Sequence, residues 1–291
     1  MPSQLRITIL TDNAASQRYH SEWGLSVHVS YGTTSYVLDF GQSETFAQNA
    51  RMLGIDLGTV DHAVLSHAHY DHADGMEAFF SLNDHAPLHL SATCSENCWS
   101  TKGGTTEAHY IGVRPGLLDA YADRLERAPV DHATTIAPGV HLVPHTTEGL
   151  ARKGERDGML LGDGVTLVPD DLSHEMSLVF ELDGKRGPEL VVLNSCSHAG
   201  VPVIVDEVSD ALPGRRIAAF VGGLHLMRSS NTEILTTANV LRDVGVGTVW
   251  TGHCTGERAL ELLKRELPGR VRELGPGLRF SVGVATDPEE A

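Results

Sequence analysis

A short apolar strand that runs directly into a histidine cluster is the feature that most constrains this chain. Val60–Ser66 has the composition of a buried strand, and the next six residues are His67-Ala68-His69-Tyr70-Asp71-His72. A helical pattern begins immediately afterwards, at Ala73. A strand that passes so quickly into a helix is typical of a sheet covered by helices, with polar residues where the strand gives way to the next element.

The rest of the chain repeats this alternation of short strands and helices. Strand patterns cover Leu5–Leu10, Leu25–Ser30, Tyr36–Phe40, Pro87–Ser91, Val140–Val143, Val165–Val168, Ser177–Leu182, Leu190–Asn194, Ile217–Val221 and Thr248–Thr251. Helical patterns cover Glu44–Leu53, Ala73–Leu82, Leu117–Arg127, Val203–Leu212, Thr232–Asp243 and Gly256–Leu267. We therefore predict an α/β layered fold. No linker, repeat or low-complexity tract divides the chain, so residues 1–291 are expected to form a single domain.

Two polar segments lack a clear periodicity. The stretch from Cys94 to Pro115 is rich in Gly and Thr, and it predicts a long loop that could act as a lid over a site. Cys94 and Cys98 within it are spaced C-x₃-C without a second pair nearby, which favours a structural or surface pair over a zinc site. The charged run Glu155–Asp157 is interpreted as a solvated loop.

Composition excludes several classes of function. The chain has 22 Lys+Arg against 38 Asp+Glu, a formal charge of −16, and no basic cluster, which argues against nucleic-acid binding. It has no run of about 18 apolar residues and no secretory leader pattern, so we expect no membrane association and a cytoplasmic location. Small molecules are the expected partners, and the sequence does not predict an oligomeric state.

The histidine cluster has the spacing of a metal site. In an extended segment the side chains of His67 and His69 point to the same side, so both can bind one ion. The turn into the helix then brings Asp71 and His72 toward a second position about 3.5–4 Å away, as in two-metal hydrolytic sites. Imidazole and carboxylate ligands suit Zn²⁺, with manganese or iron as alternatives. A chance occurrence of this pattern is expected only roughly 0.003 times in a chain with 16 histidines.

With these residues, the chain resembles the metallo-β-lactamase superfamily. Tyr36-Val37-Leu38-Asp39-Phe40-Gly41 is similar to the first motif of that family, in which the Asp supports the site, and Thr251-Gly252-His253-Cys254-Thr255-Gly256 is similar to its last motif, in which the His binds the second metal. The resemblance implies a four-layered αβ/βα sandwich with two similar halves, here roughly residues 1–145 and 146–291. Further segments resemble the dihydropterin-ribofuranosylaminobenzene-phosphate synthase-like subgroup: Thr11–Asn13, Trp23–Ser26, His174–Leu178, Asn194–Gly200 and Gly222–Leu226.

The middle of the chain departs from the family pattern. The family takes a third His from a Gly-His-Thr segment and a bridging Asp from a Gly-Asp strand end, whereas this chain has His145-Thr146 and Ser195-Cys196 in those places. Thiolate and imidazole are both zinc donors, so Cys196 could take the place of the bridging carboxylate, and His198 is expected to be a ligand. His145 is the rival third ligand. Following a Gly pair, His225 is expected to face substrate, support a ligand or be a core histidine.

These residues favour a metal-dependent hydrolase. Two ions would lower the pKa of a shared water, and the metal-bound hydroxide would attack a small ester, lactone, thioester or phosphoester. Asp71 would ligate the second metal and orient the hydroxide, and His225 could contact the developing oxyanion. The alternative is a non-hydrolytic or redox metalloenzyme on the same fold, because a thiolate at Cys196 favours soft or redox-active metals.

Overall fold

The computed structural model describes residues 1–101, 107–185 and 187–283, which form two seven-stranded sheets that pack face to face. The first sheet has the order β18 (Arg279–Gly283), β1 (Gln4–Thr11), β2 (Ser26–Tyr31), β3 (Thr34–Leu38), β4 (His62–Val64), β5 (Leu88–Ser91) and β8 (Leu125–Ala128). The second has the order β17 (Val271–Glu273), β16 (Thr248–Thr251), β15 (Arg216–Val221), β14 (Gly187–Leu193), β13 (Met176–Gly184), β10 (Val140–Pro144) and β9 (Thr134–Ala137).

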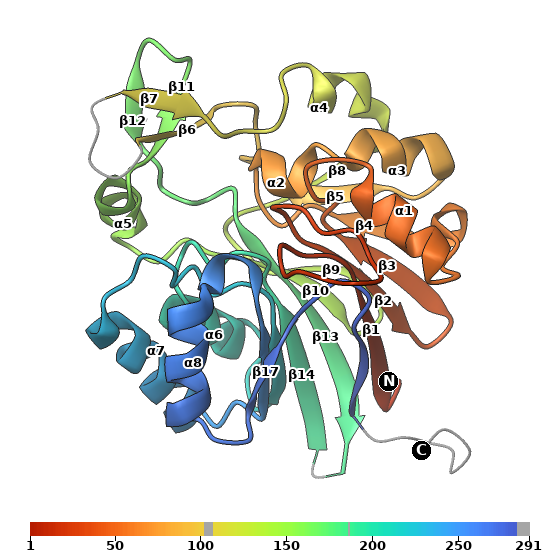
Figure 1. Cartoon of the computed structure of the whole chain (residues 1–291), viewed down its shortest axis with the longest axis vertical. Coiled ribbons are helices and arrows are strands. Elements are labelled where there is room, and N and C mark those ends of the chain that lie inside the picture. Colours follow the sequence, from red (N-terminus) through yellow and green to blue (C-terminus); the bar gives the residue numbers. More distant parts are fainter. Residues whose placement is uncertain (102–106, 186, 284–291) are drawn as a thin grey trace.

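Helices cover the outer faces of both sheets (Figure 1). On the first sheet lie α1 (Thr45–Met52), α2 (Tyr70–Ala73), α3 (Met76–Leu82) and α4 (Leu117–Ala120), and on the second lie α6 (Val201–Ala211), α7 (Asn231–Asp243) and α8 (Glu257–Glu266). Alternate residues of the strands, such as Ile7, Leu178 and Val191, fill the core between the sheets. The predicted four-layered α/β architecture is therefore confirmed.

Each sheet contains a block of parallel strands, and these strands position the site. β3, β4, β5 and β8 are parallel in the first sheet, and β14, β15, β16 and β17 are parallel in the second. Parallel neighbours end at the same edge of a sheet. Residues that follow β3, β4, β14, β15 and β16 are therefore brought together although they are far apart in the sequence.

A third sheet of four strands stands beside these layers (Figure 1). Its order is β12 (Leu167–Pro169), β11 (Met159–Gly162), β6 (Cys98–Thr101) and β7 (Ala108–Tyr110), and α5 (Leu150–Asp157) packs against it. The stretch predicted as a long loop from Cys94 to Pro115 thus contains two paired strands, and only residues 102–106 lie outside the described residues. The loop prediction missed these strands because β6 pairs not only with β7 but also with β11, which lies about 60 residues further along the chain.

Other predictions need correction. The helix expected over Leu117–Arg127 stops at Ala120, and its last residues form β8, because pairing with β5 outweighs their helical pattern. The helix expected over Ala73–Leu82 is broken before Met76, where Gly75 packs so closely that a Cβ would collide with the Phe40 carbonyl oxygen.

The predicted division near residue 145 does not follow the two large sheets. β9 and β10 precede it and belong to the second sheet, and β18 returns from the end of the described chain to the first sheet. Among the described residues, no helix is long and apolar enough to cross a membrane.

Candidate metal centre

His67 and His198 form a first pair of facing histidines. Their Nε2 atoms lie 3.2 Å apart, and both side chains are buried. The Ser66 hydroxyl donates to Asp39 Oδ2 at 2.7 Å, so its oxygen is left to accept the Nδ1 proton of His67 at 2.8 Å. The Nε2 lone pair of His67 therefore points at His198.

His72 and His253 form a second pair, and the positions of their protons are also determined by neighbours. His72 Nδ1 donates to Asp39 Oδ2 at 2.8 Å, and His253 Nδ1 donates to Asn13 Oδ1 at 3.2 Å. Their Nε2 atoms then face each other at 3.1 Å, and Asp71 Oδ2 lies 3.7 and 3.6 Å from them. Two imidazole nitrogens and a carboxylate thus converge on one point.

The electrostatics of the two pairs fit a bound cation. Burial lowers the pKa of His253 to about 3, and burial together with neighbouring histidines lowers the pKa of His67 and His198 well below the usual value, so these rings are neutral. Burial also disfavours the charged form of His72, but Asp71 and Asp39 outweigh it and raise its pKa to about 9. Nitrogens held at about 2.0–2.1 Å by tetrahedral zinc would lie about 3.3 Å apart, close to the separations in both pairs.

Cys196 lies between the two pairs. Its sulfur is within 4.8 Å of ligand nitrogens of His67 and His198, and it has the same relation to His72 and His253. This is the place expected for a bridging ligand. The i, i+2 spacing of Cys196 and His198 would place both side chains on one face of an extended segment, but Ser197 between them has a φ of 51° and lies in a turn. The turn is held because Ser197 N donates to Asn194 Oδ1 and its hydroxyl donates to the Gly223 carbonyl.

A second thiol, Cys254, lies beside Cys196. Their sulfur atoms are 3.1 Å apart, and both cysteines are free and buried. His225 contacts both, since its Nδ1 lies 3.7 Å from Cys196 Sγ and its backbone N–H donates to Cys254 Sγ at 3.3 Å. A side chain at Gly223 would displace the Cys254 sulfur, so the glycine is required for this approach. His225 is therefore a neighbour of the candidate ligands rather than a core histidine.

His69, expected to share an ion with His67, lies beside the first pair. Its ring centroid lies 4.6 Å from that of His67 and 4.7 Å from that of His198. Its Nε2 is buried and has no hydrogen-bond partner. A separate group of buried residues surrounds it, formed by Cys98, Asp170 and His174. Cys98, expected in a structural or surface pair, is therefore buried next to a candidate ligand.

His145 is placed away from this centre. Its Nδ1 donates to Glu207 at 2.7 Å, and its Nε2 accepts a hydrogen bond from the Ser177 hydroxyl at 2.9 Å. Both ring nitrogens therefore have protein partners, and among the described residues His145 joins none of the clusters able to hold a metal. The geometry favours His198 over His145 as the third histidine.

Backbone strain is concentrated at the centre. Five non-glycine residues in the described part of the chain have positive φ, and four of them follow strands at this edge: Asp39 (59°), Ser197 (51°), His225 (51°) and His253 (48°). Such conformations cost free energy in L-residues and persist where the surrounding structure enforces them, typically at functional sites.

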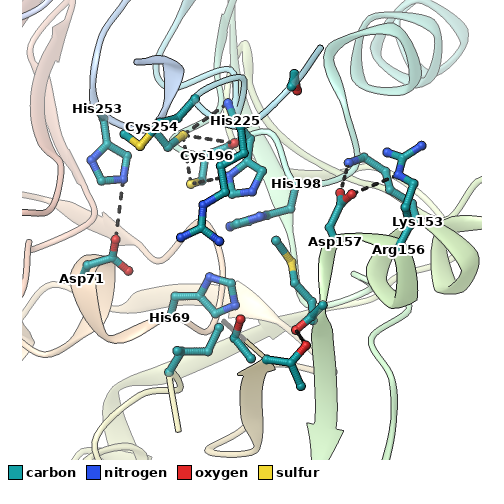
Figure 2. Close-up of a pocket in the computed structure, with 18 of the residues that line it drawn as sticks. His69, Asp71, Lys153, Arg156, Asp157, Cys196, His198, His225, His253 and Cys254 are labelled. Atoms are coloured by element: carbon teal, nitrogen blue, oxygen red, sulfur yellow. Dashed lines mark hydrogen bonds and ion pairs between the residues drawn. The ribbon is translucent and has the colours of Figure 1, made fainter. Parts of the chain in front are cut away.

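The centre opens into a cavity of about 720 Å³. Figure 2 shows His69, Asp71 and His253 on one side of this cavity and Lys153, Arg156 and Asp157 of α5 on the other, with His198 and His225 between them. The charged run interpreted as a solvated loop is thus part of a helix, and it lines the cavity. Asp157 binds Lys153 at 2.5 Å and Arg156 at 3.0 Å.

Several supporting residues were not identified as such from the sequence. Asn13 fixes the His253 ring, and the buried Glu175 carboxylate accepts the backbone N–H groups of His198 at 2.8 Å and Ala199 at 2.7 Å. Both lie in segments that resemble the synthase-like subgroup, and that resemblance was the one signal that could have found them. No spacing rule links Glu175 to a histidine 23 residues away.

Comparisons with known proteins agree with this geometry. The family model described as the metallo-beta-lactamase superfamily matches residues 24–151. The crystal structure of Tm1679, described as a metal-dependent hydrolase of the β-lactamase superfamily, aligns with a TM-score of 0.80 and 30% sequence identity, covering 96% of this chain and 100% of that one. The chain belongs to the metallo-β-lactamase superfamily. Members of this superfamily are mostly metal-dependent hydrolases.

Other similar proteins are more distant in sequence. The 7,8-dihydropterin-6-methyl-4-(beta-D-ribofuranosyl)-aminobenzene-5'-phosphate synthase of Methanocaldococcus jannaschii is 23% identical over 264 residues, which cover 87% of this chain and 84% of the relative. A diphosphatase from the PhnP family shares the fold with a TM-score of 0.54 at 16% identity, covering 97% of this chain and 99% of that one.

Proposed function

We propose that this chain is a metal-dependent hydrolase that acts on a small ester, lactone, thioester or phosphoester. The observation that carries the proposal is the convergence of the Nε2 atoms of two histidine pairs, at 3.2 and 3.1 Å, beside a cavity of about 720 Å³. The set His67, His69, His198 would hold one ion, and Asp71, His72, His253 would hold a second, with Cys196 between them. Zinc fits these donors, and manganese or iron are alternatives.

Bound ions of this kind activate water as a nucleophile near neutral pH and polarise the bond under attack. The chain's own residues would prepare the reactants. Asp71 reaches the second pair from the first turn of α2, and burial raises the pKa of its carboxyl group. It would accept a hydrogen bond from the attacking water and orient it.

His225 would contact the oxygen on which charge develops. Its ring centroid lies 4.3 Å from that of His198, it lines the cavity, and its φ of 51° is held by the loop that follows β15. A donor held in place before the reaction stabilises developing charge without a reorganisation cost. The cavity also suits a small-molecule partner, since about 720 Å³ is within the usual range for such sites.

A non-hydrolytic metalloenzyme is the second candidate. Cys196 and Cys254 place two thiols 3.1 Å apart in this centre, and thiolates favour soft or redox-active metals. The Methanocaldococcus jannaschii relative is named a synthase, which also indicates chemistry other than hydrolysis.

The deciding experiment combines metal analysis with a substrate panel. Protein purified without added metal would be analysed for zinc, manganese and iron, then reconstituted and tested on chromogenic esters, lactones, thioesters and phosphodiesters. We expect zinc or manganese and turnover that is lost in Asp71→Asn. Stoichiometric iron would favour the second candidate. So would a reconstituted wild-type protein that hydrolyses none of these substrates faster than Asp71→Asn does.

A further inference from the structure

We infer that Asp170 and His174 are positioning residues for His69, holding its ring proton on Nε2 so that Nδ1 is left to bind a metal ion. The inference rests on the proposed function, because it assumes that His69 is a ligand. Asp170 follows β12 and His174 precedes β13, so both come from a connection far from the histidine cluster in the sequence.

The buried nitrogen of His69 carries the argument. His69 is 5% exposed, and its Nε2 is one of six buried side-chain N or O atoms without a hydrogen-bond partner among the described residues. An unsatisfied buried polar atom costs free energy, so it needs an explanation. Ligand atoms of His69, Cys98, Asp170 and His174 all lie within 4.8 Å of one another, and all four residues are buried.

The protons of this group can be assigned from the backbone. Ala68 N–H donates to His174 Nδ1 at 3.2 Å, so Nδ1 accepts and the ring proton of His174 is on Nε2. That Nε2–H donates to Asp170 Oδ2 at 3.0 Å, and Asp170 Oδ1 accepts the backbone N–H of Leu172 at 2.7 Å. Each carboxylate oxygen has a further lone pair, so Asp170 can also accept a hydrogen bond from the Nε2–H of His69.

The same assignment argues against a separate metal ion in this group. A nitrogen that carries a proton cannot ligate, and His174 Nε2 is also the atom that lies 3.8 Å from Cys98 Sγ. The group is therefore a hydrogen-bonding support behind His69. Carboxylates commonly orient metal-binding histidines in this way, and hydrogen bonds of this kind are often long until the ligand binds.

The test compares Asp170→Asn with Asp171→Asn. The asparagine at 170 places an N–H where Oδ2 accepts, whereas Asp171 is exposed and its side chain accepts only a local N–H, from Ser173 at 3.0 Å. We expect Asp170→Asn to weaken binding of one ion about 10–100-fold in a chelator competition, and Asp171→Asn to bind as the wild type does. His174→Gln provides a second variant if Asp170→Asn does not fold.

Nitrogen NMR of the histidine rings in the metal-free protein supplies a readout independent of metal and activity. We expect His69 as the Nε2–H tautomer in the wild type and a shift toward Nδ1–H in Asp170→Asn. An Nδ1–H tautomer in the wild type, unchanged metal affinity in both variants, or a further ion that is lost in Cys98→Ala would each overturn the inference. If the chain bound no metal, the proposed function would fail. The tautomer of His69 would still show whether Asp170 and His174 hold its ring proton on Nε2.

Discussion

His72 Nε2 and His253 Nε2 lie 3.1 Å apart, although the two residues are separated by 181 positions in the sequence. Asp39 and Asn13 accept the Nδ1 protons of the two rings, so both Nε2 atoms point into the gap. Hydrogen bonds to the other ring nitrogens thus hold this pair of nitrogen donors in place. Such preorganisation raises affinity because less ordering remains to be done on binding.

Asp39→Asn should weaken metal binding while leaving the backbone unchanged. The φ of Asp39 is 59°, a conformation that asparagine tolerates well, but the amide cannot accept all the hydrogen bonds that Ser66 and His72 donate to the carboxylate. We expect a loss of about 10–100-fold in affinity by chelator competition. Thermal unfolding of the metal-free variant serves as the control for folding, and wild-type affinity would contradict the role given to Asp39.

His198→Ala and His145→Ala should have opposite effects on metal content and stability. Removing His198 takes one donor from the first pair, so we expect elemental analysis to show one ion fewer per chain and activity to fall by about 100-fold or more. Removing His145 leaves Glu207 without its ring partner and should lower the free energy of unfolding while the ion count stays unchanged. Loss of an ion in His145→Ala with retention in His198→Ala would reverse the assignment.

Hydrolysis, measured in single turnovers, should rise with pH through an apparent pKa near 7. Burial lowers the pKa of His67, His198 and His253, so these donors are neutral across this range. His72, whose pKa is raised by Asp71 and Asp39, would give up its extra proton when it binds an ion, so the ionisation that remains is that of the activated water. Single-turnover rates avoid masking by product release. A flat profile from about pH 5 to 9 would count against the mechanism.

Metal-free protein should form a disulfide between Cys196 and Cys254 when it is incubated with oxidised glutathione. One thiolate attacks the glutathione disulfide and releases one glutathione thiol, and the second cysteine then displaces the other, so two protein thiols are oxidised as one disulfide is reduced. Their sulfur atoms are already 3.1 Å apart. Mass spectrometry of tryptic peptides should find the two cysteines linked, and Cys254→Ala should lack the link. A product carrying only glutathione adducts would contradict the prediction.

His28 should contribute to acid sensitivity of the fold. Burial, with a smaller effect of Arg279, lowers the pKa of His28 to about 4, so the unfolded chain binds more protons than the folded chain between about pH 6.5 and 4. The contribution of His28 to the free energy of unfolding is therefore fully present above about pH 6.5. As the pH falls through this window, the free energy of unfolding decreases by on the order of 3 kcal/mol. Urea unfolding of metal-free His28→Gln should show a flatter pH dependence than wild type, and parallel curves would contradict this.

The sequence by itself determined the local elements that carry the chemistry. Patterns of a few residues predict the strand before His67, the turn at Asp71 and His72 that leads into a helix, and the strand-end position of His253. The structure has each of them, with the helix beginning slightly earlier than predicted, at Tyr70. These patterns need no distant partner, because strand and helix signals and i, i+2 spacing are local. The same patterns supported the resemblance to the metallo-β-lactamase superfamily and the α/β fold.

Only the tertiary structure decided which distant residues meet. β6 and β11 pair although about 60 residues separate them, and the charged run Glu155–Asp157 lies in α5 and lines the cavity. Cys98, Asp170 and His174 lie close to His69. Local sequence favoured His198 as a ligand but left His145 as a rival, because both histidines follow strand patterns. The choice depends on which ring nitrogens are already occupied, and that follows from the packing of two sheets whose parallel strands end at one edge.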